Sequence, residues 1–117
     1  MKLELTARGI EISSDLREFI AKRVHFSFGR FAGRIRRLSI RLADLNGPRG
    51  GIDQCCDVRV NAGLPRKIVV RERQATIHAA IAIAMGRAER VVQRQIGLES
   101  AARGRPSPSR RSFGFGD

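Results

Sequence analysis

The chain has 117 residues, which suffices for one domain with a modest core and is too short for two independent ones. It carries 23 Lys and Arg against 11 Asp and Glu, a formal net charge of +12, so the folded chain repels itself unless an anionic partner neutralises it. No apolar run approaches the roughly 18 residues that span a bilayer and no signal segment follows Met1, so we expect a cytoplasmic protein without a membrane partner.

The first third of the chain reads as a strand followed by a helix. Residues 2–8 alternate between apolar and polar side chains, which is the period of a half-buried strand. Ser13 or Ser14 then offers an N-cap, and apolar residues recur at three- and four-residue steps from about residue 14 to residue 31. We expect a helix over this range, with Gly33 as its stop.

A period of two returns from residue 34 and predicts three further strands. Their apolar and polar residues alternate over about 34–42, 55–62 and 68–73. The Gly-rich residues 46–51 and the Gly63 turn separate them, so consecutive strands are expected to form hairpins.

The last third of the chain predicts a second helix and a tail. Small and aliphatic residues repeat at helical spacing over 77–97, whereas residues 98–117 are rich in Gly, Ser, Pro and Arg. We expect a folded domain over 1–97 and a disordered tail over 98–117. The element order indicates an α+β fold with a four-stranded sheet and two helices packed on one face.

Catalytic chemistry finds little support in the sequence. The two imidazoles, His25 and His78, lie on predicted helices without a partner set for nucleophilic catalysis. The Gly-rich residues 46–51 lack the Lys-Ser/Thr of a P-loop and join two strands. We therefore expect no enzyme, no cofactor and no small-molecule substrate.

A metal site is not expected either. Cys55 and Cys56 are neighbours on a predicted strand and should point to opposite faces, so they complete no zinc site. Asp53 and Asp57 share one face of that strand and could hold a metal, but in so basic a chain they are more simply partners for arginines.

The cations of the second helix form a predicted ridge. Arg87, Arg90 and Arg94 fall at i, i+3 and i+7, within about 60° of arc, beside the apolar stripe and in solvent. Few acids compensate them there, since Glu89 stands alone between residues 76 and 97. We interpret the ridge as an RNA contact, against the alternative of a solvated charged face.

A second stripe mixes rings with guanidinium groups on the first helix. It consists of Phe19, Arg23, Phe26 and Arg30, at i, i+4, i+7 and i+11. Such interleaving suits phosphate contacts combined with base stacking. Phe26 could equally pack against the other helix.

From Met1 to about Ile96 the sequence resembles the ribosome hibernation promoting factor family, the ribosome-associated inhibitors also called sigma-factor modulation proteins. The residues that carry the resemblance are Glu11-Ile12-Ser13 before Leu16-Arg17, Lys22-Arg23, Phe31, Ile77 to Ile81 with its central Ala79-Ala80, and Arg87, Arg90 and Arg94.

The resemblance implies a fold similar to the double-stranded RNA-binding domain with an added first strand. It also implies binding to the small ribosomal subunit and its RNA, in the channel of transfer RNA and messenger RNA, which silences idle ribosomes. The positions that carry over are Arg17, Lys22, Arg23, Arg87, Arg90 and Arg94.

The sequence departs from the family at Phe26 and Phe28, where the family more often has polar residues. Long members continue into a second domain that pairs two ribosomes, so we expect a short form that does not pair them by itself; weak self-association stays open. Two alternatives remain, a general double-stranded RNA-binding module and a regulator that binds a transcription protein.

Overall fold

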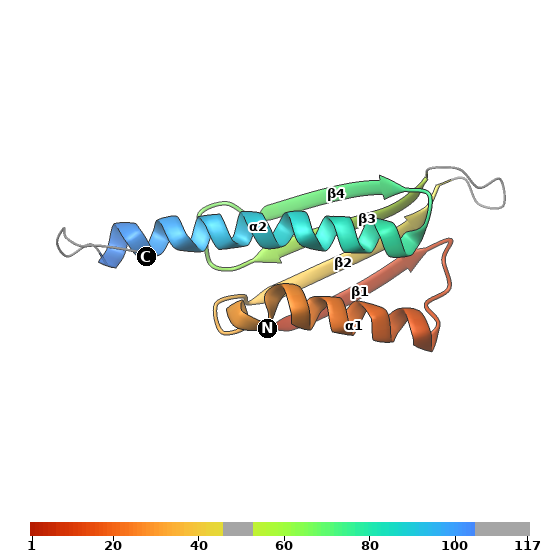
Figure 1. Cartoon of the computed structure of the whole chain (residues 1–117), viewed down its shortest axis with the longest axis horizontal. Coiled ribbons are helices and arrows are strands. Elements are labelled where there is room, and N and C mark those ends of the chain that lie inside the picture. Colours follow the sequence, from red (N-terminus) through yellow and green to blue (C-terminus); the bar gives the residue numbers. More distant parts are fainter. Residues whose placement is uncertain (46–52, 105–117) are drawn as a thin grey trace.

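A computed structural model describes residues 1–45 and 53–104 (Figure 1). Its elements, in chain order, are β1 (Lys2–Arg8), α1 (Ser14–Phe28), the 3-10 helix η1 (Gly29–Phe31), β2 (Arg37–Asp44), β3 (Gln54–Asn61), β4 (Ile68–Gln74) and α2 (Ile77–Gly104). This order and the α+β class confirm the fold predicted from the sequence.

The four strands form one sheet in the order β1-β2-β3-β4. β1 and β2 run parallel, while the other two pairs are antiparallel. Parallel neighbours need a crossover connection, which α1 supplies. Both helices lie on the same face of the sheet: α2 packs along β3 and β4, and α1 lies beside α2 (Figure 1). Within the described residues no helix lies on the opposite face, and we call it the open face.

The core lies between the helices and the sheet and is aliphatic. From the strands, alternate residues such as Leu38, Ile40 and Val58 are fully buried. From α2, Ala84 and Ala88 are also fully buried, and such small side chains let the helix lie close to the sheet. The alternation that predicted the strands is therefore the alternation between this core and the open face.

The first helix begins as predicted and ends earlier. The Ser13 hydroxyl accepts a hydrogen bond from the Leu16 N–H at 3.1 Å, which satisfies one of the free donors of the first turn. The α-helix ends at Phe28, and η1 continues the chain to Phe31. The expectation of one helix to residue 31 is thus corrected to a helix followed by a tighter turn.

The second helix is longer than predicted. It continues to Gly104, so the expectation that it ends at Gly97 and that a disordered tail begins at Leu98 is wrong for residues 98–104. A glycine inside a helix costs only about 1 kcal/mol relative to alanine, and the buried Ile96 anchors the turn at Gly97. The predicted turn at 46–51 and the rest of the predicted tail lie outside the described residues.

Candidate nucleic-acid interface

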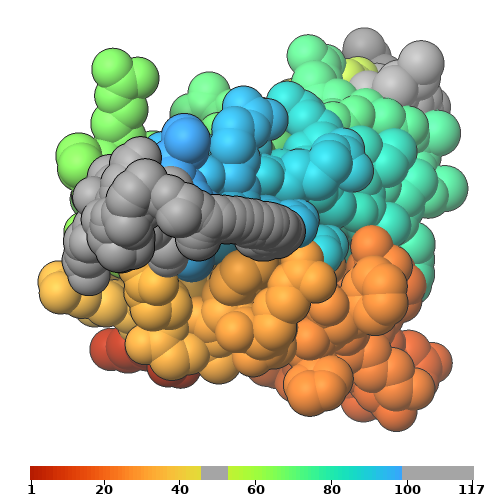
Figure 2. Space-filling model, turned by 60° about the vertical axis from the view of Figure 1, so that its left-hand side comes forward, coloured from red at the N-terminus to blue at the C-terminus, as the bar shows by residue number. Residues whose placement is uncertain are grey.

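The two helices meet along a seam that two predicted site residues cross (Figure 2, α1 in orange beside α2 in blue). From α1, the Arg23 Nη2 atom donates to the Ala82 carbonyl of α2 at 3.4 Å. From η1, Arg30 Nη2 donates to Glu89 Oε2 and Gln93 Oε1, both at 3.3 Å. Arg23 and Arg30 therefore both contact α2 across the seam, at points about two helical turns apart.

Arg23 is only partly satisfied by these contacts. Its side chain is half-buried, and its Nε–H has no hydrogen-bond acceptor in the described part of the chain. Its guanidinium carbon lies 5.4 Å from the centre of the Phe26 ring, a cation–π distance. A phosphate oxygen at the seam would supply the missing acceptor.

Phe26 projects into solvent, with 72% of its surface exposed. The alternative that it packs against the other helix is therefore wrong. The side chain that does contact α2 from this stripe is Phe19, whose ring meets His78 edge to face at 4.7 Å. This contact also accounts for His78 as a packing residue.

The predicted ridge on α2 divides into two parts. Arg90 and Arg94 are exposed and form no ion pair within residues 1–45 and 53–104. Arg87, in contrast, reaches β4, where its Nη1 donates to Glu72 Oε1 at 2.7 Å and to the Arg71 carbonyl at 2.9 Å. The three cations share one helix, but Arg87 is engaged at the sheet edge.

The two remaining site residues lie elsewhere on α1. Lys22 is exposed and pairs with Glu18 at 3.5 Å, one helical turn earlier. Arg17 is exposed and falls about 120° around the helix from Arg23, on the flank away from the seam. The structure thus places Arg23 and Arg30 along the seam and leaves Arg17 away from it.

The ion pairs at this surface are weak obstacles to an anionic ligand. The exposed Lys22–Glu18 pair contributes about 0–1 kcal/mol, and salt screens it. In the other pair Glu89 is only 22% exposed, but Arg30 is 58% exposed and its guanidinium group has further N–H donors for a phosphate. We use the name helix surface for Arg23, Phe26, Arg30, Arg90 and Arg94.

The carboxylate that holds Arg87 is tuned by its neighbours. Hydrogen bonds from Gln74 and then from Arg87 lower the pKa of Glu72 below its ordinary value of 4.5. Glu72 is therefore ionised at neutral pH and fixes α2 to the edge strand β4. No sequence pattern predicted this ion pair, because Glu72 and Arg87 are 15 residues apart, one on a strand and the other on a helix.

Sequence reasoning missed Glu89 and Gln93 as partners of Arg30, and it did not include the outward arginines of the strands among the site residues. Arg41, Arg71 and Arg73 stand at outward positions of β2 and β4, as the strand alternation predicted. Asp57 lies among them and pairs with Arg71 at 3.3 Å, which confirms that it serves as a partner for arginines.

The two cysteines point to opposite faces of the sheet, as expected for neighbours on a strand. Cys56 faces the core, and its burial, followed by the nearby Asp57 and Cys55, raises the pKa of its thiol to about 12. Cys55 faces the open side and is half-buried. In the described ranges no three His, Cys, Asp or Glu side chains gather as metal ligands, and no helix is long and apolar enough to cross a membrane.

Comparison with known proteins places this fold. Residues 3–97 match the family model described as sigma 54 modulation protein / S30EA ribosomal protein. A solved structure of a ribosomal subunit interface protein from Coxiella burnetii is similar, with 17% identity, a TM-score of 0.65, and coverage of 86% of this chain and 99% of that one. The Protein Y N-terminal domain from Thermus thermophilus matches with 24% identity, a TM-score of 0.65, and coverage of 80% and 98%. No curated protein sequence matches the chain.

Proposed function

The chain belongs to the sigma 54 modulation protein / S30EA ribosomal protein family, and on this premise we propose that it is a ribosome hibernation factor. In this proposal it binds the small ribosomal subunit through the helix surface. It occupies the channel of transfer RNA and messenger RNA and so inhibits translation in idle cells. Work at the ribosome would keep the protein in the cytoplasm.

The observation that carries the proposal is the position of the cations on the two helices. Arg90 and Arg94 project without carboxylate partners in the described structure, and Arg23 and Arg30 lie at the adjoining seam. Arginine suits this role because its planar fork contacts phosphate oxygens in pairs. Such contacts would supply affinity and fix the position of the protein. Inhibition would then come from steric exclusion of transfer RNA and messenger RNA from the channel.

Phe26 would add a second kind of contact at the same surface. An exposed ring beside a guanidinium group can stack on an unpaired base, and such stacking contributes about 1–3 kcal/mol per base. The ring and Arg23 are already held against each other. This combination favours RNA with accessible bases over a uniform duplex.

The test is cosedimentation with small subunits at several salt concentrations. The double variant Arg90→Glu, Arg94→Glu should lose association, because each lost phosphate contact lowers affinity and flattens the salt dependence. Arg66→Glu, Lys67→Glu makes the same change of charge at the exposed β3–β4 turn and should still cosediment. Equal binding by both double variants would remove the helix surface from the proposal.

A second readout tests the inhibition itself. Added protein should prevent transfer RNA from binding to small subunits in a filter assay, because both need the same channel. If the protein cosediments and transfer RNA still binds fully, channel blocking is wrong while ribosome binding stands. Equal affinity for any RNA duplex would favour the general RNA-binding module instead, and binding that is insensitive to salt would favour a protein partner.

A further inference from the structure

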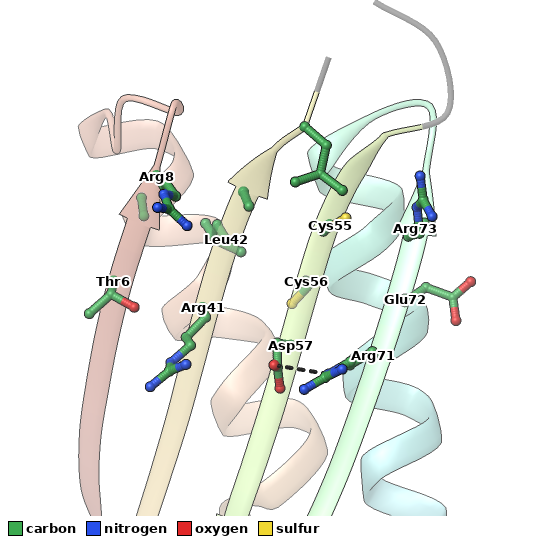
Figure 3. Close-up of a pocket in the computed structure, with 13 residues that line it drawn as sticks. Thr6, Arg8, Arg41, Leu42, Cys55, Cys56, Asp57, Arg71, Glu72 and Arg73 are labelled. Carbon is green, nitrogen blue, oxygen red and sulfur yellow. Dashed lines mark ion pairs between the residues drawn. The ribbon is translucent and has the colours of Figure 1, made fainter. Parts of the chain in front are cut away.

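The open face of the sheet carries a second cationic site, at the end where β1 and β2 finish (Figure 3). A depression of about 700 Å³ lies there, and we call it the bowl. Two rows of paired residues cross the strands beneath it, Arg8, Ala43, Cys55 and Arg73 in one and Thr6, Arg41, Asp57 and Arg71 in the other.

The bowl is hollow because of the order of side-chain sizes along these rows. Small side chains, Ala43 and Cys55, occupy the two central strands of the outer row, and Thr6 lies beside them on β1. Long arginines stand around them on β1, β2 and β4, as Figure 3 shows for Arg8, Arg41, Arg71 and Arg73. A ligand can therefore rest on a floor of small groups with guanidinium groups at its sides.

The charge of the bowl calls for an anion. Arg71 is paired with Asp57, and Arg73 is paired with Asp53. Arg8 and Arg41 are exposed and have neither an ion pair nor a hydrogen bond in the described part of the chain. Positive charge therefore exceeds negative charge here, and two guanidinium groups are available without breaking an existing contact.

The cationic surface does not stop at the rim. Lys2 and Arg37 stand side by side toward the opposite end of the open face, and Arg59 lies between them and the bowl. Arg37 pairs there with Glu4 and Arg59 with Asp57, both at 3.5 Å, so three cations face two carboxylates along this strip. A compact anion would use the bowl alone, whereas an extended polyanion can follow the strands over their length of about 20–25 Å. The arrangement favours the extended ligand.

The side chains of this face also indicate which part of a nucleic acid they contact. None of the outward residues described on the four strands is aromatic, so the face offers no ring for base stacking. Apolar anchors of the kind that hold peptides are few, the exposed ones being Val69 and Leu45 at its border. Arginine forks around small groups fit phosphates, whose contacts carry no sequence information.

We propose that the open face binds the phosphodiester backbone of a single RNA strand, without sequence preference, as a site separate from the helix surface. This goes beyond the helix surface and does not depend on it. Since the sites lie on opposite sides of a single sheet, both can be occupied at once.

The test measures binding of a labelled uridine oligonucleotide of about a dozen residues, a length typical of single-strand sites. The double variant Arg8→Gln, Arg41→Gln removes two unpaired charges without adding repulsion. We expect its affinity to fall about tenfold at low salt and the slope of log K against log salt to decrease by about 1.4, since each phosphate contact on a single strand accounts for about 0.7. The same oligonucleotide in cytidine should bind alike.

Arg66→Gln, Lys67→Gln is the matched control, because it removes the same charge from exposed positions off the open face. It should change the affinity less than the bowl variant does. An equal loss in both, or no loss in either, would overturn the proposal. Circular dichroism of each variant checks that the fold is intact.

Competition experiments distinguish an RNA strand from a compact anion and from an acidic protein as the ligand of the open face. If uridine triphosphate displaces the oligonucleotide at equal phosphate concentration, the bowl is a site for compact anions and the extended strand is wrong. If polyglutamate of equal charge displaces it as well, the face binds acidic protein instead. Little displacement by either supports the RNA strand.

The two proposals fail separately. Loss of small-subunit binding by Arg90→Glu, Arg94→Glu with oligonucleotide binding retained supports both sites. If the wild-type chain does not cosediment with subunits but the bowl variant still loses the oligonucleotide, the hibernation function is wrong and the open-face site stands. If the wild-type chain binds small subunits and the bowl variant keeps full oligonucleotide affinity, the open-face site is wrong and the hibernation function stands.

Discussion

The burial and the chemistry of a strand residue in this chain depend on which face of the sheet its side chain occupies. Cys55 and Cys56 are chemically identical neighbours, yet Cys55 is half-buried on the open face and Cys56 has no exposed surface. Their opposite orientation could be predicted from the strand period alone. The raised pKa of the Cys56 thiol could not, because it depends first on the burial of Cys56 beneath the helices and then on the charge of Asp57.

We therefore expect one fast and one protected thiol in the folded protein. At pH 8 a disulfide reagent such as Ellman's should modify Cys55, while Cys56, with a pKa of about 12 and no exposed surface, stays a thiol. In denaturant both should react. Cys55→Ser should abolish the fast phase and Cys56→Ser should leave it; two equally fast thiols in the native protein would contradict the assigned orientation.

Among the elements, local patterns predicted the strands and the start of each helix, and long-range contacts decided the rest. Ser13 capped α1 as its spacing indicated. The prediction that the second helix ends at Gly97 was wrong, because the helix propensity of a single residue is a weak guide once Ile96 packs on the core. The exposed cations of the site were predictable, but the partners of Arg30 and Arg87 were not, since they come from other elements.

The Glu72–Arg87 contact between β4 and α2 gives stability a pH dependence. The pKa of Glu72 is lower in the folded chain than its ordinary 4.5, so its ionised form stabilises the fold above about pH 4.5. This contribution is lost as the pH falls through the lowered pKa. Glu72→Gln should therefore be less stable than wild type at pH 7, with the gap closing toward strongly acidic pH.

Urea unfolding at pH 7 and at several acidic values measures that gap, and Glu18→Gln is the matched control. Glu18 also pairs with a cation, but both partners are exposed on one helix, so its effect should be smaller. A gap for Glu72→Gln that is constant across pH would show that the carboxylate does not act through its charge.

For the whole molecule, net charge opposes folding while the core favours it. A charge of +12 on one small domain creates repulsion that the few exposed ion pairs only partly offset. The fold class was predictable because the apolar face of each helix and strand had to be buried against another element. The existence of two cationic faces was not, because the pairing of strands had to bring outward arginines side by side.

Screening this repulsion should stabilise the free protein. Raising NaCl from about 0.01 M to 1 M shortens the Debye length from about 30 to 3 Å. We expect the thermal midpoint to rise by about 4–8 °C, which corresponds to about 1 kcal/mol in a domain of this size. Arg66→Glu, Lys67→Glu carries less positive charge and should gain less. A midpoint that falls with salt would mean that attraction between ion pairs dominates.

The two outer strands of the sheet have a consequence for how copies of the chain meet. β1 and β4 each have one neighbour, so each leaves a row of backbone groups free on its outer side. Lys2 and Arg8 stand on one of these strands and Arg71 and Arg73 on the other. Edge-to-edge growth of the sheet would set cation against cation, which guards crowded copies against aggregation.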